Sequence, residues 1–513
     1  MSPPEAGSQR RQLDTRLILE FSNRGPQLQE SFCLRKRYSR KDGRSKATVN
    51  ERSCSIGYHL AFLLVLLTRI SCLQANAEVM KAGVAKVDIT PPPGVQMWGY
   101  FDRLKGAEGT LDPLYARVLV LETGTGATGN GRLAYVDLDL GRTFGPASLE
   151  QLRAAVKKSS GIDHLIVQAT HTHAGPVVMD QYPSATPAWE TAALGKIEQA
   201  IAQAQQRLVP VRLGVGYREA SIGYNRRRPN PDGTVTMIWQ NPTRIPTWPV
   251  DPTMAVLRID QMDGQPLAIL VNYAAHPVTF GPDNMRFSAD FPGVMCQVVE
   301  QAFDGKPLAF FVQGAPGDIN VFDATTPVAQ NAVGRRDWAG ETLGNAATEA
   351  ARGIQTSADP DPSIDFAEDS LAMNLRWNPE KFRKDILSSI SPKAFELFSP
   401  PIQEIMHLPV TTVLIDRKIA IMTMPGEPFV EFQMNFRDRC PVHDCFFLGY
   451  SNGYYGYFPT IPAATEGGYG ATSATTWVQT GAGEQMVDHS VIELYKMLGR
   501  LQDAPRENWQ NFR

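Results

Sequence analysis

The stretch LAYVDLDLGRTFGPASLEQLRAAVKKSSGIDHLIVQATHTHAGP, residues 133–176, decides the fold. Residues 133–140 have the pattern of a strand and end at Gly141, and residues 146–159 have the periodicity of an amphipathic helix. Residues 164–170 then form a second apolar run, which ends in a polar turn. A strand, a helix and a strand in succession predict an α/β fold with helices packed on a sheet.

The rest of the chain continues this alternation. A surface break at 356–362 marks an internal boundary, and residues 223–252 mix proline, tryptophan and arginine without a period, which predicts a long loop. Residues 411–429 predict a hairpin with its turn near Asp416 and Arg417. Further strands are expected at 84–90, 115–122, 212–220, 255–260, 266–277 and 308–320, and further helices at 189–208, 292–302, 340–354 and 484–501. We therefore predict a single large α/β catalytic domain of layered mixed β-sheets with flanking helices.

The composition is that of an ordinary soluble globular protein. Of the 513 residues, 43% are hydrophobic and 20% are charged, and the formal net charge is −3. A chain of this length can bury a sizeable core. No excess of basic residues points to nucleic acid as a partner, and the sequence predicts no protein partner.

The N-terminal region differs from the rest of the chain. Residues 1–53 are rich in Arg, Lys, Ser and Gln and predict a disordered basic leader. Residues 54–77 resemble a signal peptide, because an apolar run at 60–67 precedes an A-x-A cleavage pattern at 75–77. The apolar run is too short to span a membrane. We expect an exported protein, periplasmic or secreted, whose mature domain is 78–513; a signal anchor is the alternative.

Cleavage would leave three of the six cysteines, Cys296, Cys440 and Cys445. An odd number excludes a fully paired disulfide framework. Cys440 and Cys445 could close a small disulfide loop in an oxidising compartment, whereas Cys296 lies in a helix-like stretch and is expected to be a buried thiol. The absence of a CxxC pair argues against a cysteine-based zinc site.

Three predicted strands end in a polar group that suits a metal. The strand at 164–170 leads to His171 and His173, the strand at 266–277 leads to His276, and the hairpin leads to Glu427. Sites in layered α/β folds lie at strand ends, so these residues can converge. His171 and His173 face the same side of an extended segment, where their Cβ atoms are about 6.6 Å apart. One metal could therefore take both rings, or take one and leave the other as its hydrogen-bonding neighbour.

Several motifs together resemble the neutral/alkaline, non-lysosomal ceramidase family. The resemblance covers residues 81 to about 480 and lies in the combination and order of the motifs. In chain order, the motifs are KAGVAKVDITPPPG, DPLYARVLVLE, QATHTHAGP, YNRRRP, NYAAHP, VQGAPGDIN, MPGEPF and YSNGYYGYFPT.

The resemblance implies a zinc hydrolase and assigns roles to individual residues. The zinc ligands of the family correspond to His171, His276, Glu427 and Tyr457. The residues that contact substrate correspond to His173, Arg226 and Tyr469, which would offer hydrogen bonds to the developing oxyanion or to polar substrate groups. Histidine, glutamate and tyrosine donors also suit manganese or iron.

Two departures from the family pattern affect the expected mechanism and substrate. A serine that is discussed as a nucleophile in the family is replaced by Asn320, which disfavours a serine mechanism. Only 56 residues follow Tyr457 in the 513-residue sequence, so we expect no C-terminal immunoglobulin-like domain. Together with the dissimilar loop at 223–252, this makes an N-acyl amide other than ceramide a plausible substrate.

The sequence therefore predicts an exported zinc-dependent hydrolase of linear amide bonds, which acts on a small-molecule or lipid amide such as an N-acyl-sphingosine. Peripheral contact with a membrane fits such a substrate. The first alternative is a zinc esterase or a peptidoglycan-type amidase with the same metal. The second alternative is a catalytically silent relative that binds lipid or glycan, although the intact set His171, His276, Glu427 and Tyr457 argues against it.

Overall fold

Two mixed β-sheets form the centre of the fold in the computed structural model, which describes residues 79–124, 131–389, 403–473 and 475–501. The described residues belong to a unit that spans residues 75–513, and the predicted leader and signal peptide lie outside them. The order in the larger sheet is β13 (Leu308–Gln313), β11 (Pro266–Tyr273), β10 (Thr253–Gln261), β6 (Val209–Glu219), β1 (Lys81–Asp88), β3 (Tyr115–Glu122), β4 (Arg132–Leu138) and β5 (His164–Ala169). The order in the smaller sheet is β15 (Ile364–Asn374), β16 (Ile405–Ile415), β17 (Ile419–Thr423) and β19 (Asp444–Leu448).

Three strand pairs are parallel, and they carry the polar motifs. β4 pairs with β5, β11 with β13 and β17 with β19 in parallel, whereas the other neighbours in the two sheets are antiparallel. All six residues of β13 are buried, as expected for a parallel strand that is covered on both faces.

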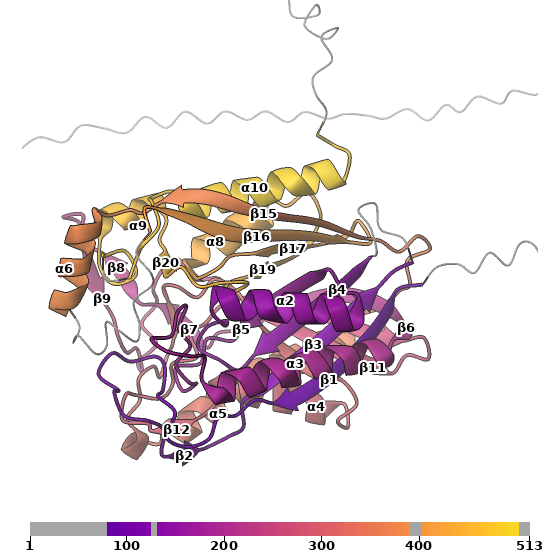
Figure 1. Cartoon of the computed structure of the whole chain (residues 1–513), viewed down its shortest axis with the longest axis horizontal. Coiled ribbons are helices and arrows are strands. Elements are labelled where there is room, and N and C mark those ends of the chain that lie inside the picture. The colour runs from indigo at the N-terminus through magenta and orange to yellow at the C-terminus, as the bar shows by residue number, and fades with distance from the viewer. Residues whose placement is uncertain (1–78, 125–130, 390–402, 474, 502–513) are drawn as a thin grey trace, which may run out of the picture. The chain divides into compact units, whose positions relative to one another are not determined.

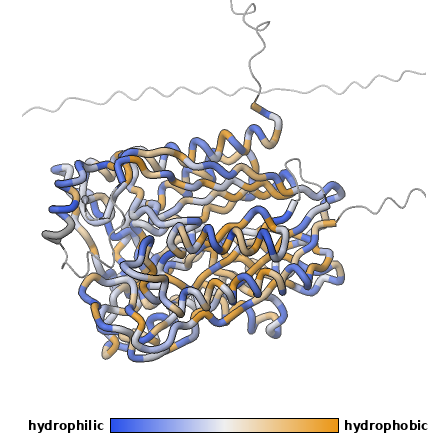
Figure 2. The backbone as a smooth tube through the Cα atoms, viewed as in Figure 1, coloured by the Kyte–Doolittle hydropathy of each residue, from blue (hydrophilic) through white to orange (hydrophobic). Residues whose placement is uncertain are grey.

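The two sheets pack face to face, and helices cover their outer faces (Figure 1). Leu133 and Phe310 of the larger sheet belong to one buried cluster with Val413 and Phe446 of the smaller sheet. Figure 2 shows hydrophobic residues concentrated along the strands, while hydrophilic and hydrophobic residues alternate along α10. The larger sheet is covered by α2 (Pro146–Ser160), α3 (Ala188–Gln206), α4 (Asp290–Ala302) and α5 (Ala332–Gly353), and the smaller sheet by α8 (Val430–Arg439) and α10 (Ala482–Met497). The predicted α/β class with layered mixed sheets is therefore confirmed.

Short elements complete the described part of the chain. The short strand pairs are β2 (Gly109–Thr110) with β12 (Arg286–Phe287), β7 (Gly223–Asn225) with β14 (Ile319–Val321), β8 (Arg227–Pro229) with β9 (Val235–Met237), and β18 (Glu427–Pro428) with β20 (Tyr457–Phe458). The remaining helices are η1 (Val328–Gln330), α6 (Pro379–Ser389) and α9 (Ile461–Glu466). Among the described residues, no helix combines the length and the apolar character needed to cross a membrane.

Two sequence predictions need correction. The segment 223–252 is not irregular throughout, because it contains β7 and the β8–β9 hairpin; the turn signal Asn-Pro-Asp-Gly at 230–233 indicates this hairpin. The helix predicted at 340–354 already begins at Ala332, because the side chain of Asn331 caps its first turn by accepting a hydrogen bond from Gly334 N. The predicted turn at Asp416 and Arg417 is confirmed, since both residues have positive φ, as in a type I′ turn.

Candidate active site

The predicted metal ligands lie where strands of both sheets end. His171 follows β5, His276 follows β11, and Glu427 follows β17 at the start of β18. These side chains are 1%, 0% and 3% exposed, respectively. His171 also has a φ of 70°, a conformation that non-glycine residues rarely adopt and that is often retained at functional sites.

Two buried glutamines connect the strand ends that carry the site. The Gln168 side chain on β5 donates hydrogen bonds to Gln313 O at 2.7 Å and to Gly449 O at 2.8 Å. The Gln313 side chain on β13 donates to Thr170 O at 2.9 Å and to Ala275 O at 3.0 Å. Thr170 and Ala275 immediately precede the two histidines, so one amide group links the backbone segments that present them.

Hydrogen bonds to backbone carbonyls fix both imidazole rings. His171 Nδ1 lies 2.5 Å from Gly141 O, and His276 Nδ1 lies 2.6 Å from Pro316 O. Because a carbonyl can only accept, each Nδ1 carries the proton and each Nε2 is left with a free lone pair. Metal-binding histidines are oriented by this kind of hydrogen bond.

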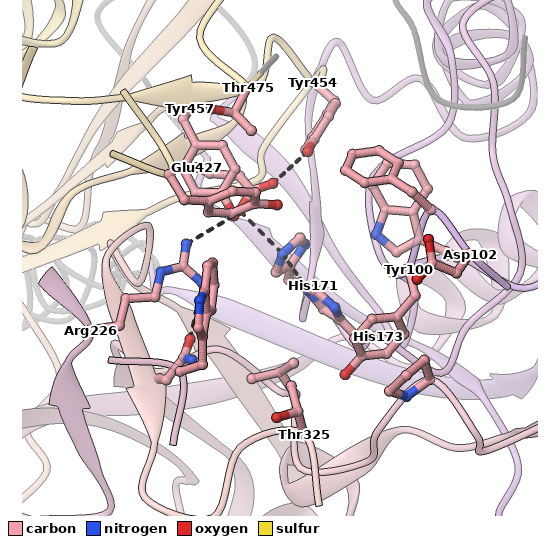
Figure 3. Close-up of a pocket in the computed structure, with 18 of the residues that line it drawn as sticks. Tyr100, Asp102, His171, His173, Arg226, Thr325, Glu427, Tyr454, Tyr457 and Thr475 are labelled. Atoms are coloured by element: carbon pink, nitrogen blue, oxygen red, sulfur yellow. Dashed lines mark hydrogen bonds and ion pairs between the residues drawn. The ribbon is translucent and has the colours of Figure 1, made fainter. Parts of the chain in front are cut away.

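Glu427 contacts both His171 and His276. Its Oε2 lies 3.1 Å from His276 Nε2 and 3.4 Å from His171 Nε2, and Figure 3 shows Glu427 and His171 beside each other. The Tyr454 hydroxyl donates to Glu427 Oε1 at 2.5 Å, and the Tyr450 hydroxyl donates to Oε2 at 3.2 Å. Both carboxylate oxygens thus accept a hydrogen bond from a tyrosine hydroxyl, which favours the charged form of Glu427. The carboxylate is therefore ionised.

His173 lies beside the same centre. Its Nε2 is 3.2 Å from His171 Nε2, and ligand atoms of His171, His173 and His276 all lie within 4.8 Å of one another. Burial lowers the pKa of His276 to about 4, and burial together with His171 holds the pKa of His173 well below its usual value. Both rings are thus neutral near pH 7. The geometry allows either arrangement predicted from the sequence, in which His173 is a ligand or the neighbour of one.

Tyr457, Arg226 and Tyr469 lie together next to the histidines. Arg226 Nη2 donates to the Tyr457 hydroxyl at 3.1 Å and to Gly317 O at 2.6 Å, and Arg226 Nη1 donates to Asn320 Oδ1 at 3.1 Å. The Tyr457 hydroxyl is 3.5 Å from His276 Nε2, and the Tyr457 and Tyr469 ring centroids are 5.4 Å apart. Burial opposes the charge of Arg226, but Tyr457 and Tyr469 outweigh it and raise its pKa, so Arg226 stays charged. The structure therefore brings all seven predicted site residues together.

A cavity of about 300 Å³ opens above this cluster. Its polar lining includes His171, His173, Arg226 and Glu427, and much of the remaining wall is apolar. Figure 3 shows Arg226 on one side of this cluster and Tyr100 with Asp102 on the other. The apolar wall residues are Trp98, Phe101, Trp239, Val278, Pro282 and Trp477. An apolar cavity with a few convergent polar groups is the usual form of a small-molecule site.

The donor set fits a divalent metal such as zinc. His171 Nε2, His276 Nε2 and Glu427 Oε2 can only accept. Glu427 Oε2 lies 3.1 Å from His276 Nε2 and 3.4 Å from His171 Nε2, and the two histidine nitrogens lie within 4.8 Å of each other. Ligands at ordinary zinc distances in a tetrahedral site are about 3.3 Å apart. Three acceptors that converge in a buried place repel one another unless a cation lies between them.

The sequence did not indicate several contributors to the site. Tyr450 stacks on the His171 ring with centroids 4.1 Å apart, and Tyr454 holds Glu427. Tyr454 is the first tyrosine of the N-x-Y-x-x-Y block, whose position two residues after Asn452 could have identified it. Asn452 anchors this block to β5, because its Oδ1 accepts a hydrogen bond from Val167 N at 3.0 Å. No pattern in the sequence points to Gln313.

Three other buried carboxylates, those of Asp139, Asp290 and Asp318, have structural partners. Asp139 forms a buried ion pair with Arg117 at 2.8 Å. The Asp318 carboxylate accepts from Val430 N at 2.8 Å at the start of α8, and Asp290 accepts from Phe291 N at 2.6 Å at the start of α4. Each of these two carboxylates satisfies a backbone N–H in the first turn of a helix, Asp290 within its own helix and Asp318 from a distant part of the chain.

Comparison with known proteins identifies relatives. The family model described as "Neutral/alkaline non-lysosomal ceramidase, N-terminal" matches residues 80–333. The neutral ceramidase of Pseudomonas aeruginosa is 28% identical over 274 residues, which cover 50% of this chain and 39% of the relative. Neutral ceramidase A of Dictyostelium discoideum is 26% identical over 295 residues, which cover 52% of this chain and 39% of the relative. The matches thus span about two fifths of the length of these relatives.

The fold is shared with a solved structure. The crystal structure of neutral ceramidase from Pseudomonas aeruginosa superimposes with a TM-score of 0.62 at 20% sequence identity, over 84% of this chain and 77% of that chain. The structural match shows a common fold, and the family match confirms the resemblance seen in the motifs. Through residues 80–333, the chain belongs to the neutral/alkaline non-lysosomal ceramidase family.

Proposed function

We propose that this protein is a zinc-dependent hydrolase of linear amide bonds, which cleaves an N-acyl amide such as an N-acyl-sphingosine into a fatty acid and an amine. The observation that carries the proposal is the convergence of His171 Nε2, His276 Nε2 and Glu427 Oε2 at the base of a largely apolar cavity. Membership of the ceramidase family supports the choice of a lipid amide.

Each group around the cavity has a defined task in this reaction. His171, His276, Glu427 and Tyr457 would hold the metal, which supplies Lewis acidity and lowers the pKa of water at the site. Arg226 offers a fixed, charged donor to the oxyanion that develops from the amide carbonyl. His173 is neutral near pH 7 and can accept a proton there and pass it to the departing amine. The apolar walls hold the acyl chain and exclude water.

Asn320 disfavours a serine nucleophile at this site. It occupies the position that the family resemblance assigns to a serine, and its Oδ1 accepts a hydrogen bond from Arg226 Nη1 at 3.1 Å. A carboxamide has no hydroxyl to attack a carbonyl carbon. Its place in the structure indicates that it holds the guanidinium of Arg226.

The test is a comparison of an amide with the matching ester. The full chain is loaded with zinc and given a fluorescent short-chain N-acyl-sphingosine or its ester analogue. We expect amide turnover that His276→Ala abolishes and that His443→Ala, at a histidine whose side chain is 84% exposed, leaves unchanged. Turnover of the ester alone would favour a zinc esterase, and turnover of neither would favour another amidase or a silent binding protein.

We also propose that the protein is exported and that residues 78–513 form its mature domain. The proposal rests on the A-x-A pattern at 75–77, which follows a short apolar run. N-terminal sequencing of the protein recovered outside the cytoplasm should begin near residue 78. Recovery of the whole chain in the membrane fraction would favour the signal anchor instead.

A further inference from the structure

Large apolar side chains are exposed on the segment 238–249, which we call the rim segment. Trp239, Ile245 and Trp248 are 47%, 58% and 71% exposed, respectively. In the described part of the chain, eleven large hydrophobic side chains are exposed, and these three fall within ten consecutive positions. Single exposed apolar residues are common on any surface, but a concentration of them marks a contact surface.

Hydrogen bonds from two buried asparagines hold the rim segment in place. Asn241 donates from Nδ2 to Ile245 O at 2.8 Å and accepts from Ile245 N at 2.8 Å. Asn225 donates from its backbone N to Thr247 Oγ1 at 2.8 Å and from Nδ2 to Pro249 O at 2.8 Å. The apolar side chains are therefore presented to solvent by an ordered loop, because its backbone is fixed at several points.

The rim segment is continuous with the cavity. Trp239 lines the cavity, and its ring centroid lies 5.3 Å from that of Tyr469. Ile238 N donates to Arg226 O at 2.7 Å, and Gln240 Nε2 donates to Thr325 Oγ1 at 3.2 Å. Since Arg226 and Thr325 also line the cavity, the exposed surface begins at the cavity mouth.

The charges around these apolar side chains suit a phosphate-bearing surface. Arg228 and Arg244 are exposed, and neither forms an ion pair with a carboxylate among the residues that the structure describes. The Arg244 guanidinium lies 4.4 Å from the centroid of the Trp338 ring. Between 228 and 249, Asp232 is the sole acidic residue. Tryptophan and arginine side by side on an apolar surface are typical of proteins that bind the interface of a bilayer.

We propose that the rim segment, with Arg228, docks onto the surface of a lipid bilayer. Ile245 and Trp248 would enter the headgroup and upper acyl region, and Arg228 and Arg244 would face lipid phosphates. A lipid amide would then leave the bilayer next to Trp239 and enter the cavity without crossing water. The proposal rests on the proposed function only for the identity of the molecule that enters the cavity.

Peptide-resolved hydrogen exchange of the full chain tests this contact. Exchange is measured with and without vesicles of phosphatidylcholine and phosphatidylglycerol. We expect backbone amides of 238–249 to exchange several-fold more slowly with vesicles. A bilayer contact made through another part of the chain would leave their exchange unchanged and would overturn the proposal.

Variants outside the cavity lining separate docking from catalysis. The double variant Ile245→Ser with Trp248→Ser should abolish this protection. It should also lower the fraction of protein that is bound to vesicles through the rim segment by about tenfold. The control Met262→Ser, at a side chain that is 50% exposed elsewhere, should behave as the wild type. Turnover of a monomeric short-chain amide should be equal in all three proteins, so a loss of docking is distinguishable from a failure of the proposed hydrolase activity. Protection in the double variant, or a wild type in which this segment mediates a dimer instead, would contradict bilayer docking.

Discussion

Replacement of Gln313 by leucine tests whether the glutamine link between the strand ends builds the site. The Gln313 amide donates to the carbonyls of Thr170 and Ala275, which precede His171 and His276. Leucine has nearly the same size and is apolar, so Gln313→Leu removes both donors while the buried packing volume is nearly conserved.

The expected cost follows from the hydrogen bonds that are lost. Two carbonyls lose a donor at a place where Gln313 is 0% exposed, and each loss costs about 1–3 kcal/mol. Gln313 Oε1 has no hydrogen-bond partner in the structure, so its removal returns about 1–2 kcal/mol. At the middle of these ranges, the free energy of unfolding should fall by about 2–3 kcal/mol. Because the link joins the segments that carry both histidines, zinc affinity should also fall by about tenfold.

Urea denaturation and a zinc titration against a competing chelator measure these two effects. Gln205→Leu is the matched control, because its amide makes one hydrogen bond, to Ser160 O at 2.7 Å, at a partly exposed place. This control should lose less than about 1 kcal/mol and keep its zinc affinity. If Gln313→Leu matched the control in both measurements, the link would have no part in forming the site.

Three further changes have defined outcomes. Tyr454→Phe removes a donor to Glu427 and should weaken zinc binding by about tenfold in a chelator competition. The neighbouring Tyr455 hydroxyl donates to His407 O instead, so Tyr455→Phe should leave zinc binding unchanged. Equal effects of the two changes would contradict the role of Tyr454. Arg226→Lys should lower kcat/KM for an N-acyl-sphingosine by about 100-fold at unchanged zinc content, because the lysine ammonium cannot reproduce the forked hydrogen bonds of a guanidinium. An unchanged kcat/KM would argue against Arg226 as the oxyanion donor. Burial raises the pKa of Asp416 from 3.8 to about 6, so this residue favours the folded state below about pH 4 and loses that effect as the pH rises through 6. Asp416→Asn should consequently raise the melting temperature at pH 8 and leave it unchanged at pH 4, and a difference of the opposite sign would refute the assignment.

Local patterns were sufficient to predict the elements and the main site residues. A strand such as 164–170 is apolar over its length, and the polar residues His171 and His173 come where pairing ends. The same arrangement recurs before His276 and Glu427. Because parallel strands bring such ends to one edge of a sheet, the convergence of these residues could be expected before the sheet order was known.

The pairing of distant segments could not be predicted in the same way. Gln168 and Gly449 are hydrogen-bonded although 281 positions separate them, and the two sheets meet there at the site. Nothing in either local sequence specifies this partner, since it depends on how whole strands are ordered. The positions of Tyr450 and Tyr454 around Glu427 follow from that contact, so the sequence pattern identified their block but not their task.

The exposed rim segment could be predicted in part. Its mixture of proline, tryptophan and arginine without a period indicated a loop. The asparagines that hold it, Asn225 and Asn241, were indistinguishable from turn residues in the sequence, because asparagine favours turns as well as buried hydrogen-bonded positions. The structure was needed to separate the two.

Metal content is the most direct test of the central claim that the buried donor cluster holds zinc. Elemental mass spectrometry of the purified full chain should find about one zinc per chain in the wild type and almost none in His171→Ala or His276→Ala. His489→Ala is the control, since its group with Asp369 and Glu493 is the other place where metal-ligating atoms converge in the described residues. Retention of zinc in His489→Ala is predicted. Zinc that persists in both His171→Ala and His276→Ala, or a folded wild type that takes up no metal, would contradict the account.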